Sequence, residues 1–177
     1  MSKKPMLCCF GILLAVSLTA VLAQGQAKEQ PKQALPPARK IPGITAPDPH
    51  PHACVDCHIN YPEMNLDARF STQMAQWNEK VEPGLLAKAQ ASAPEGMILQ
   101  GRHPNVPGVF YDIPASCLVC HRKDSPVSPP FAQMIHSIHL TGGNENHFLT
   151  IYQGECTHCH KLDLSTGRWT IPSAPEK

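Results

Sequence analysis

The pattern Cys-x-x-Cys-His occurs three times in this chain of 177 residues. It reads CVDCH at 54–58, CLVCH at 117–121 and CTHCH at 156–160. The chain has eight cysteines, and the two outside the pattern, Cys8 and Cys9, lie in the N-terminal segment. Any fold of this chain must therefore accommodate three units in which an imidazole directly follows a pair of closely spaced thiols.

This pattern is the signature of covalent haem attachment. Two thiols add to the two vinyl groups of one haem, and a two-residue spacer lets both sulfurs reach the same edge of the ring. The histidine that follows then lies beneath the ring plane, where it can bind the iron as proximal ligand. We therefore expect three haem c groups. The predicted attachment residues are Cys54, Cys57, Cys117, Cys120, Cys156 and Cys159, and the predicted proximal ligands are His58, His121 and His160.

Two other uses of paired cysteines compete with this interpretation. A CxxC unit can supply half of a zinc site, or it can act as a redox dithiol. Paired zinc-binding units usually lie closer together than the 63 residues between the first two motifs. Neither use requires a histidine after every second cysteine. Three such units, which include every cysteine beyond the N-terminal segment, therefore favour haem.

The N-terminal 23 residues have the form of a secretory signal peptide. Lys3 and Lys4 precede the uncharged run FGILLAVSLTAVLA, and small residues at its end form a cleavage site. The run is shorter than the roughly 20 apolar residues of a membrane span, with an uncleaved anchor as the alternative. We therefore expect a periplasmic or otherwise exported protein, associated with a membrane only through this segment.

The composition predicts a protein core with few buried apolar side chains. Proline is frequent at 19 residues, and aromatic residues make up only 6% of the chain. A chain of this size with few long apolar segments buries little surface unaided. We expect a mostly α fold with extensive loop and little or no β-sheet, a small multihaem cytochrome c fold organised around its three haem groups.

Charge argues against nucleic acid as a partner. Without Lys3 and Lys4, the 15 lysines and arginines fall to 13 against 14 acidic residues, a net charge of −1. No basic patch stands out in the sequence, whereas a clustered basic surface is the usual mark of nucleic-acid binding. We therefore do not expect nucleic acid as a partner.

The chain is expected to have three parts. Residues 1–23 form the signal peptide, residues 24–51 a Pro-rich extended tether, and residues 52–177 the trihaem domain. Few apolar groups in the tether are available for burial. Packing of its last third across the domain is the alternative.

Helices are expected at three places in the domain. Residues 65–81 carry apolar side chains at helical spacing, with Asn65 as N-cap and Pro83-Gly84 as the stop. A shorter helix is expected through 85–89, and FAQMIHSIHL at 131–140 predicts another between two prolines and two glycines. The face of the first helix consists of Leu66, Phe70, Met74, Trp77 and Val81.

Seven of the ten histidines lie outside the proximal positions, and three irons need distal ligands. This surplus predicts bis-histidine ligation at every iron. His136 and His139, spaced i, i+3, are neighbours on one side of a helix, so each can serve a different haem. His103 is the third choice, with His147 and His52 as second-tier alternatives. His50 and His158 are weaker candidates.

The chain resembles the multihaem c-type cytochromes. More narrowly, MIHSIHLTGGN followed by ECTHCH, with CLVCH before them, resembles the haem-binding modules of decahaem outer-membrane cytochromes over residues 102–160. The resemblance implies that His136, His139 and His103 are the distal ligands. The segment CHKLDLSTGRW at 159–169 is similar to parts of small cytochromes that feed periplasmic flavin reductases.

These features predict an electron carrier rather than an enzyme. Closed bis-histidine sites suit electron transfer at low potential, because they leave no position for a substrate. The expected partners are a quinol-linked or periplasmic electron donor and a terminal reductase as acceptor. The protein is either a free carrier or the electron-transfer subunit of a larger reductase or extracellular electron-transfer chain. A haem enzyme of the nitrite or hydroxylamine type, with one open iron, is the alternative.

Overall fold

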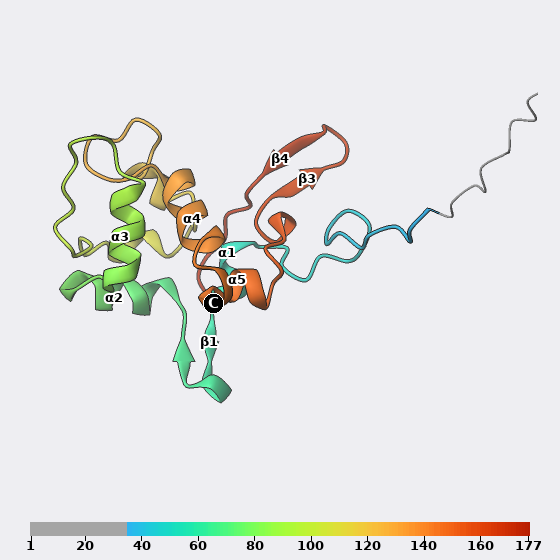
Figure 1. The fold of residues 1–177 in the computed structure, drawn as a ribbon, viewed down its shortest axis with the longest axis horizontal. Coiled ribbons are helices and arrows are strands. Elements are labelled where there is room, and N and C mark those ends of the chain that lie inside the picture. The colour runs from blue at the N-terminus through green and yellow to red at the C-terminus, as the bar shows by residue number, and fades with distance from the viewer. Residues whose placement is uncertain (1–34) are drawn as a thin grey trace, which may run out of the picture. The chain divides into compact units, whose positions relative to one another are not determined.

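A computed structural model describes residues 35–177, of which Ala38–Lys177 form one compact unit (Figure 1). The expected signal peptide and residues 24–34 of the expected tether lie outside the described residues. Most of the rest of the expected tether, from residue 38 to residue 51, belongs to the compact unit. The contacts of this segment with the third motif are described below.

Within the described residues, the chain is mostly helix and loop, as expected, with two small antiparallel sheets. The α-helices are α1 (Cys54–Cys57), α2 (Phe70–Glu79), α3 (Pro83–Ala91), α4 (Phe131–Leu140) and α5 (His147–Thr150). The 3₁₀-helices are η1 (Pro62–Met64), η2 (Pro107–Val109), η3 (Cys117–Val119), η4 (Gly143–Glu145) and η5 (Cys156–His158). The strands are β1 (Asn60–Tyr61), β2 (Leu66–Asp67), β3 (Lys161–Asp163) and β4 (Arg168–Thr170).

The expected helix over 65–81 is shorter than predicted. Asn65 is not an N-cap: it ends η1 with a left-handed backbone at φ 50°. Leu66 lies in β2, opposite Tyr61 of β1, so the apolar spacing at this position comes from a hairpin. The helix α2 begins only at Phe70, after Arg69 at the N-cap.

The expected stop signal at Pro83-Gly84 instead begins the next helix. The Glu82 side chain accepts hydrogen bonds from the backbone N–H groups of Gly84 and Leu85 and so caps α3. Proline suits the first position of a helix, where its missing N–H would have no partner. The shorter helix expected through 85–89 is confirmed within α3.

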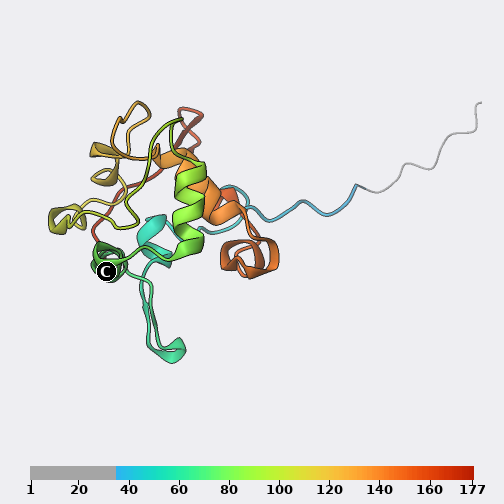
Figure 2. The ribbon, with the colours of Figure 1, turned by 60° about the vertical axis from the view of Figure 1, so that its left-hand side comes forward.

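The expected helix at 131–140 is confirmed as α4 with the same bounds. α3 packs against α4, and the two helices lie side by side in both views (Figures 1 and 2). Lys88 of α3 donates hydrogen bonds from Nζ to the carbonyl oxygens of Ile138 and Thr141. These bonds satisfy carbonyl groups at the C-terminal end of α4 that have no partner within the helix.

Few apolar side chains are fully buried in the described part of the chain. Only Ala53, Val55 and Ile113 are buried apolar residues there. Folded domains of this length normally bury a much larger apolar core. This unit therefore buries few apolar side chains completely for its length.

The longest described helices, α2 and α4, have ten residues each. A bilayer requires about 20 apolar residues in helical conformation. No helix within residues 35–177 is therefore long and apolar enough to cross a membrane.

Candidate functional site

Each histidine of a Cys-x-x-Cys-His motif faces one other histidine across a similar gap. The ring centroids are separated by 6.2 Å in the first pair, 6.1 Å in the second and 6.0 Å in the third. Two imidazoles that bind one metal ion from opposite sides, each through a nitrogen about 2.0 Å away, have centroids roughly 6.3 Å apart. Each gap therefore matches the space that one shared metal ion needs. The pairs are His58–His139, His121–His103 and His160–His136.

The first pair lies in the most enclosed part of the site. α1 carries Cys54 and Cys57, and Val55 between them is fully buried. The ring of Phe70 stacks on His58 with centroids 4.1 Å apart. Burial lowers the pKa of His58 to about 4, so the imidazole is neutral at pH 7, the form that binds metals.

Hydrogen bonds orient both imidazoles of the first pair. His58 donates from Nδ1 to the carbonyl of Ala68 at 2.9 Å, and His139 donates from Nδ1 to the carbonyl of Ile135 at 3.0 Å. A carbonyl only accepts, so Nδ1 carries the proton and Nε2 has a free lone pair. Metal-binding histidines usually have such a partner on the other nitrogen.

The second pair has the same hydrogen-bond pattern but is built from loops. His121 donates from Nδ1 to the carbonyl of Pro129, and His103 donates from Nδ1 to that of Pro104, both at 2.8 Å. The two rings are nearly parallel, with an interplanar angle of 13°. Burial lowers the pKa of His121. Both Nε2 atoms are again available to a metal.

The third pair joins α4 to the C-terminal motif. His136 is exposed on α4, and its ring is inclined by 38° to that of His160. Burial lowers the pKa of His160. The motif itself begins at η5, where Glu155 accepts a hydrogen bond from the backbone N–H of Thr157.

The helix α4 connects the first and third pairs. His136 and His139 lie one turn apart on it, and each reaches a different motif. The structure thus shows which motif histidine each of these two residues lies beside, which the sequence left open.

Thiols of the second and third motifs both act on the first motif. Burial raises the pKa of Cys54 to about 12, and the thiols of Cys159 and Cys117 contribute to this rise. Burial also raises the pKa of Cys57, again with a contribution from Cys159. The first motif is thus influenced by cysteines more than 60 residues further along the chain.

The second-tier histidines do not face any motif histidine. His52 is exposed, and its Nδ1 lies 3.3 Å from a carboxylate oxygen of Asp56. His147 begins α5 and is exposed. The weaker candidates His50 and His158 contact each other edge to face, with centroids 4.7 Å apart.

Some residues that shape the site carry no signal in the sequence. Phe70 was assigned only to a helix face, yet its ring covers His58. Asp48 pairs with Lys161 over a separation of 113 residues, which no local pattern predicts. The only sequence signal for this ion pair was the position of Lys161, a charged residue directly after the motif histidine His160.

Comparisons with family models, with curated proteins and with solved structures found no match to this chain. The chemistry of the site must therefore be inferred from the residues of this chain alone.

Each site offers two imidazoles beside two thiols, the side chains that a covalently attached haem would need. No cluster of three or more His, Cys, Asp or Glu side chains arranged to hold a metal occurs in the searched part of the chain, residues 35–177. A structural zinc site takes four protein ligands. Haem iron takes two axial ligands from the protein, because the porphyrin supplies the other four. Three imidazole pairs, each beside a pair of thiols, match the second requirement.

Proposed function

We propose that this protein is an exported trihaem c-type cytochrome that relays electrons through three bis-histidine sites. The proposal depends on one observation: the histidine of every Cys-x-x-Cys-His motif faces a second histidine at about the spacing that one shared iron requires. The three motifs predict covalent attachment, and the three ring-to-ring distances support axial ligation by the paired histidines.

Haem iron between two imidazoles supplies one-electron redox chemistry and leaves no position for a substrate. In each site, the two thiols would hold the porphyrin edge, and the two imidazoles would occupy both axial positions. The Nδ1 hydrogen bonds of His58, His139, His121 and His103 orient four of these six rings in advance. This arrangement supports a carrier over an enzyme with an open iron.

The thin core also supports the proposal. Three buried apolar residues stabilise little structure in the described part of the chain. Three porphyrins packed among these loops would supply the missing apolar surface. Bis-histidine ligation lacks the axial methionine that raises the reduction potential of a haem, so low potentials are expected.

Exposed cysteines mark where electrons would enter and leave. Cys120 of the second motif and Cys156 of the third are exposed, whereas Cys54 and Cys57 of the first are partly covered. The second and third sites would therefore exchange electrons with a quinol-linked or periplasmic donor and a terminal reductase. The first site would transfer electrons between them, as either a free carrier or a reductase subunit.

The test uses the exported protein from a host that attaches haem to cytochromes. We expect three haem groups per chain, low-spin ferric signals from all three irons in low-temperature electron paramagnetic resonance, and no binding of carbon monoxide by the native reduced protein. A high-spin signal from one iron in three, with carbon monoxide binding, would support a haem enzyme instead.

A further inference from the structure

We propose that residues 39–50, here called the strap, hold the third motif in place through an ion pair that also tunes the potential of the third site. The inference rests on the proposed function. Its basis is the Asp48–Lys161 pair, in which Lys161 is the residue directly after His160. Its carboxylate and ammonium lie 2.9 Å apart.

The strap contacts the third motif on both sides. Arg39 pairs with Glu155, the residue before Cys156, and Asp48 pairs with Lys161. Between these contacts, Ile41, Gly43, Thr45 and Ala46 close a hydrogen-bonded turn. The strap therefore binds the two residues that flank the motif in sequence.

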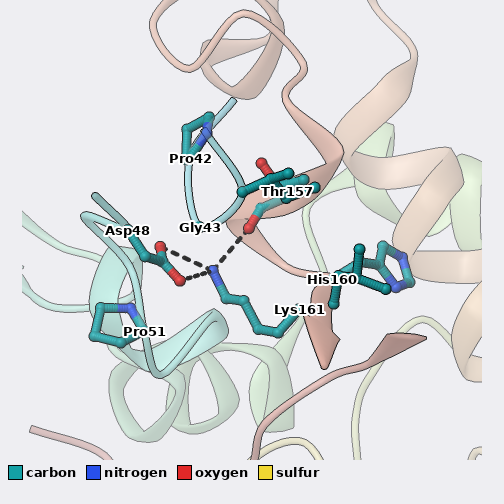
Figure 3. Close-up of a pocket in the computed structure, with 9 residues that line it drawn as sticks. Pro42, Gly43, Asp48, Pro51, Thr157, His160 and Lys161 are labelled. Atoms are coloured by element: carbon teal, nitrogen blue, oxygen red, sulfur yellow. Dashed lines mark hydrogen bonds and ion pairs between the residues drawn. The ribbon is translucent and has the colours of Figure 1, made fainter. Parts of the chain in front are cut away.

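Thr157 links the two contacts from inside the motif. Thr157 is 5% exposed, and Glu155 accepts hydrogen bonds from its backbone N–H and its hydroxyl. Its carbonyl oxygen accepts a hydrogen bond of 2.7 Å from Lys161 Nζ. One ammonium thus binds the strap and the motif backbone together, while the His160 ring points the other way (Figure 3).

The Asp48–Lys161 pair is shielded from water. The side chains of Lys161 and Asp48 are 16% and 20% exposed, and they line a cavity of about 280 Å³ with Thr157 and His160. Burial disfavours the Asp48 carboxylate, yet the hydrogen bonds from Lys161 and from the backbone N–H of His50, together with the charge of Lys161, outweigh this and hold the pKa of Asp48 below its usual value. Asp48 is therefore ionised at pH 7.

The charge of Lys161 lies beside the third site. Lys161 directly follows His160, and both residues line the same cavity. A charge held this close would act on an iron bound by His160, because the ferric form carries one more positive charge than the ferrous form.

The test measures the three reduction potentials of the haem-loaded, full-length exported protein. Lys161→Gln leaves Asp48 unpaired and favours ferric iron, so one potential falls. Asp48→Asn leaves Lys161 unpaired, so the same potential rises. The centre that moves should be the one that becomes high-spin in His136→Ala. A purely structural role would shift both variants in the same sense.

Arg122→Gln is the matched control. Arg122 follows His121 as Lys161 follows His160, but it pairs with Asp124 at the surface, where the two side chains are 56% and 85% exposed. Water screens this pair, so the shift at Lys161 should be about fourfold larger. Shifts of equal size in the two variants, or shifts of the same sign at Asp48 and Lys161, would overturn the proposal.

The double variant Asp48→Asn/Lys161→Gln distinguishes the structural role of the ion pair from its effect on the reduction potential. It also tests the proposal if the single variants fail to fold. No unpaired charge remains, so the potentials should stay near those of the wild type. Amide hydrogens of the 41–46 turn should exchange roughly fivefold faster, because the ion pair that holds the strap is lost. Unchanged exchange would overturn the proposal, whereas a wild-type protein without haem would instead refute the proposed function.

Discussion

The first and third sites differ from the second in how their proposed distal histidines are held. His136 and His139 lie on one helix, α4, whereas His103 lies in the loop before η2. The rings of the second pair are nearly parallel, and those of the first are crossed at 78°. Regular secondary structure thus couples two sites to each other, while local hydrogen bonds build the remaining site separately.

Breaking α4 should have the largest effect. Ile135→Pro removes a helical hydrogen bond and should cost about 3 kcal/mol or more of helix stability. Because α4 carries two of the proposed distal ligands, we expect high-spin signals from two irons of three in electron paramagnetic resonance. Ile135→Ala, which preserves the helix, should leave all three irons low-spin. A high-spin signal from a single iron would contradict the coupling.

Removing the loop ligand should affect one site only. His103→Ala is expected to convert one iron of three to the high-spin form and to create one binding position for carbon monoxide. The matched controls are His52→Ala and His147→Ala, since both residues are exposed and face no motif histidine. Carbon monoxide binding in either control would show that the pairing is incorrect.

Packing around the first site should matter less than ligation. Phe70→Leu removes the ring stacked on His58, which we expect to lower the free energy of unfolding by about 1 kcal/mol. Denaturant titration of the haem-loaded protein measures this loss. Tyr111→Leu is the control, because Tyr111 is 80% exposed and its substitution should cost less than about 0.5 kcal/mol. Equal losses would mean that the stacking contributes nothing.

The smallest expected effect concerns the loop that holds the second site. The Ser128 hydroxyl donates to the carbonyl of Cys120 at 2.6 Å, next to the buried hydroxyl of Ser125. Ser128→Ala should therefore destabilise the protein by about 1 kcal/mol or less. The potential of the second centre should shift while the other two stay unchanged. A shift in the potential of the first or third centre would contradict the inference that the second site is built separately from the other two.

Local sequence signals predicted the parts of the molecule that depend on neighbouring residues. The bounds of α4 follow from two prolines before it and two glycines after it. The face that begins at Leu66 was misassigned, because pairing of β2 with β1 overrides helical spacing there. That hairpin places the carbonyl of Ala68 beside His58, a long-range requirement that spacing does not reveal.

The sequence also named the six histidines that the structure brings together, but not which of them face each other. Pairing depends on where α4 lies relative to α1 and η5, which is set by contacts between segments far apart in the chain. The contacts of the strap could not be predicted from the sequence for the same reason, since Asp48 and Lys161 are 113 residues apart.

The most direct test of the account is the intact mass of the exported, mature protein. We predict the mass of the processed polypeptide plus three haem groups, with none of the six motif cysteines reacting with an alkylating reagent after denaturation. A colourless protein with the mass of the polypeptide alone, in which all six thiols are alkylated, would contradict it.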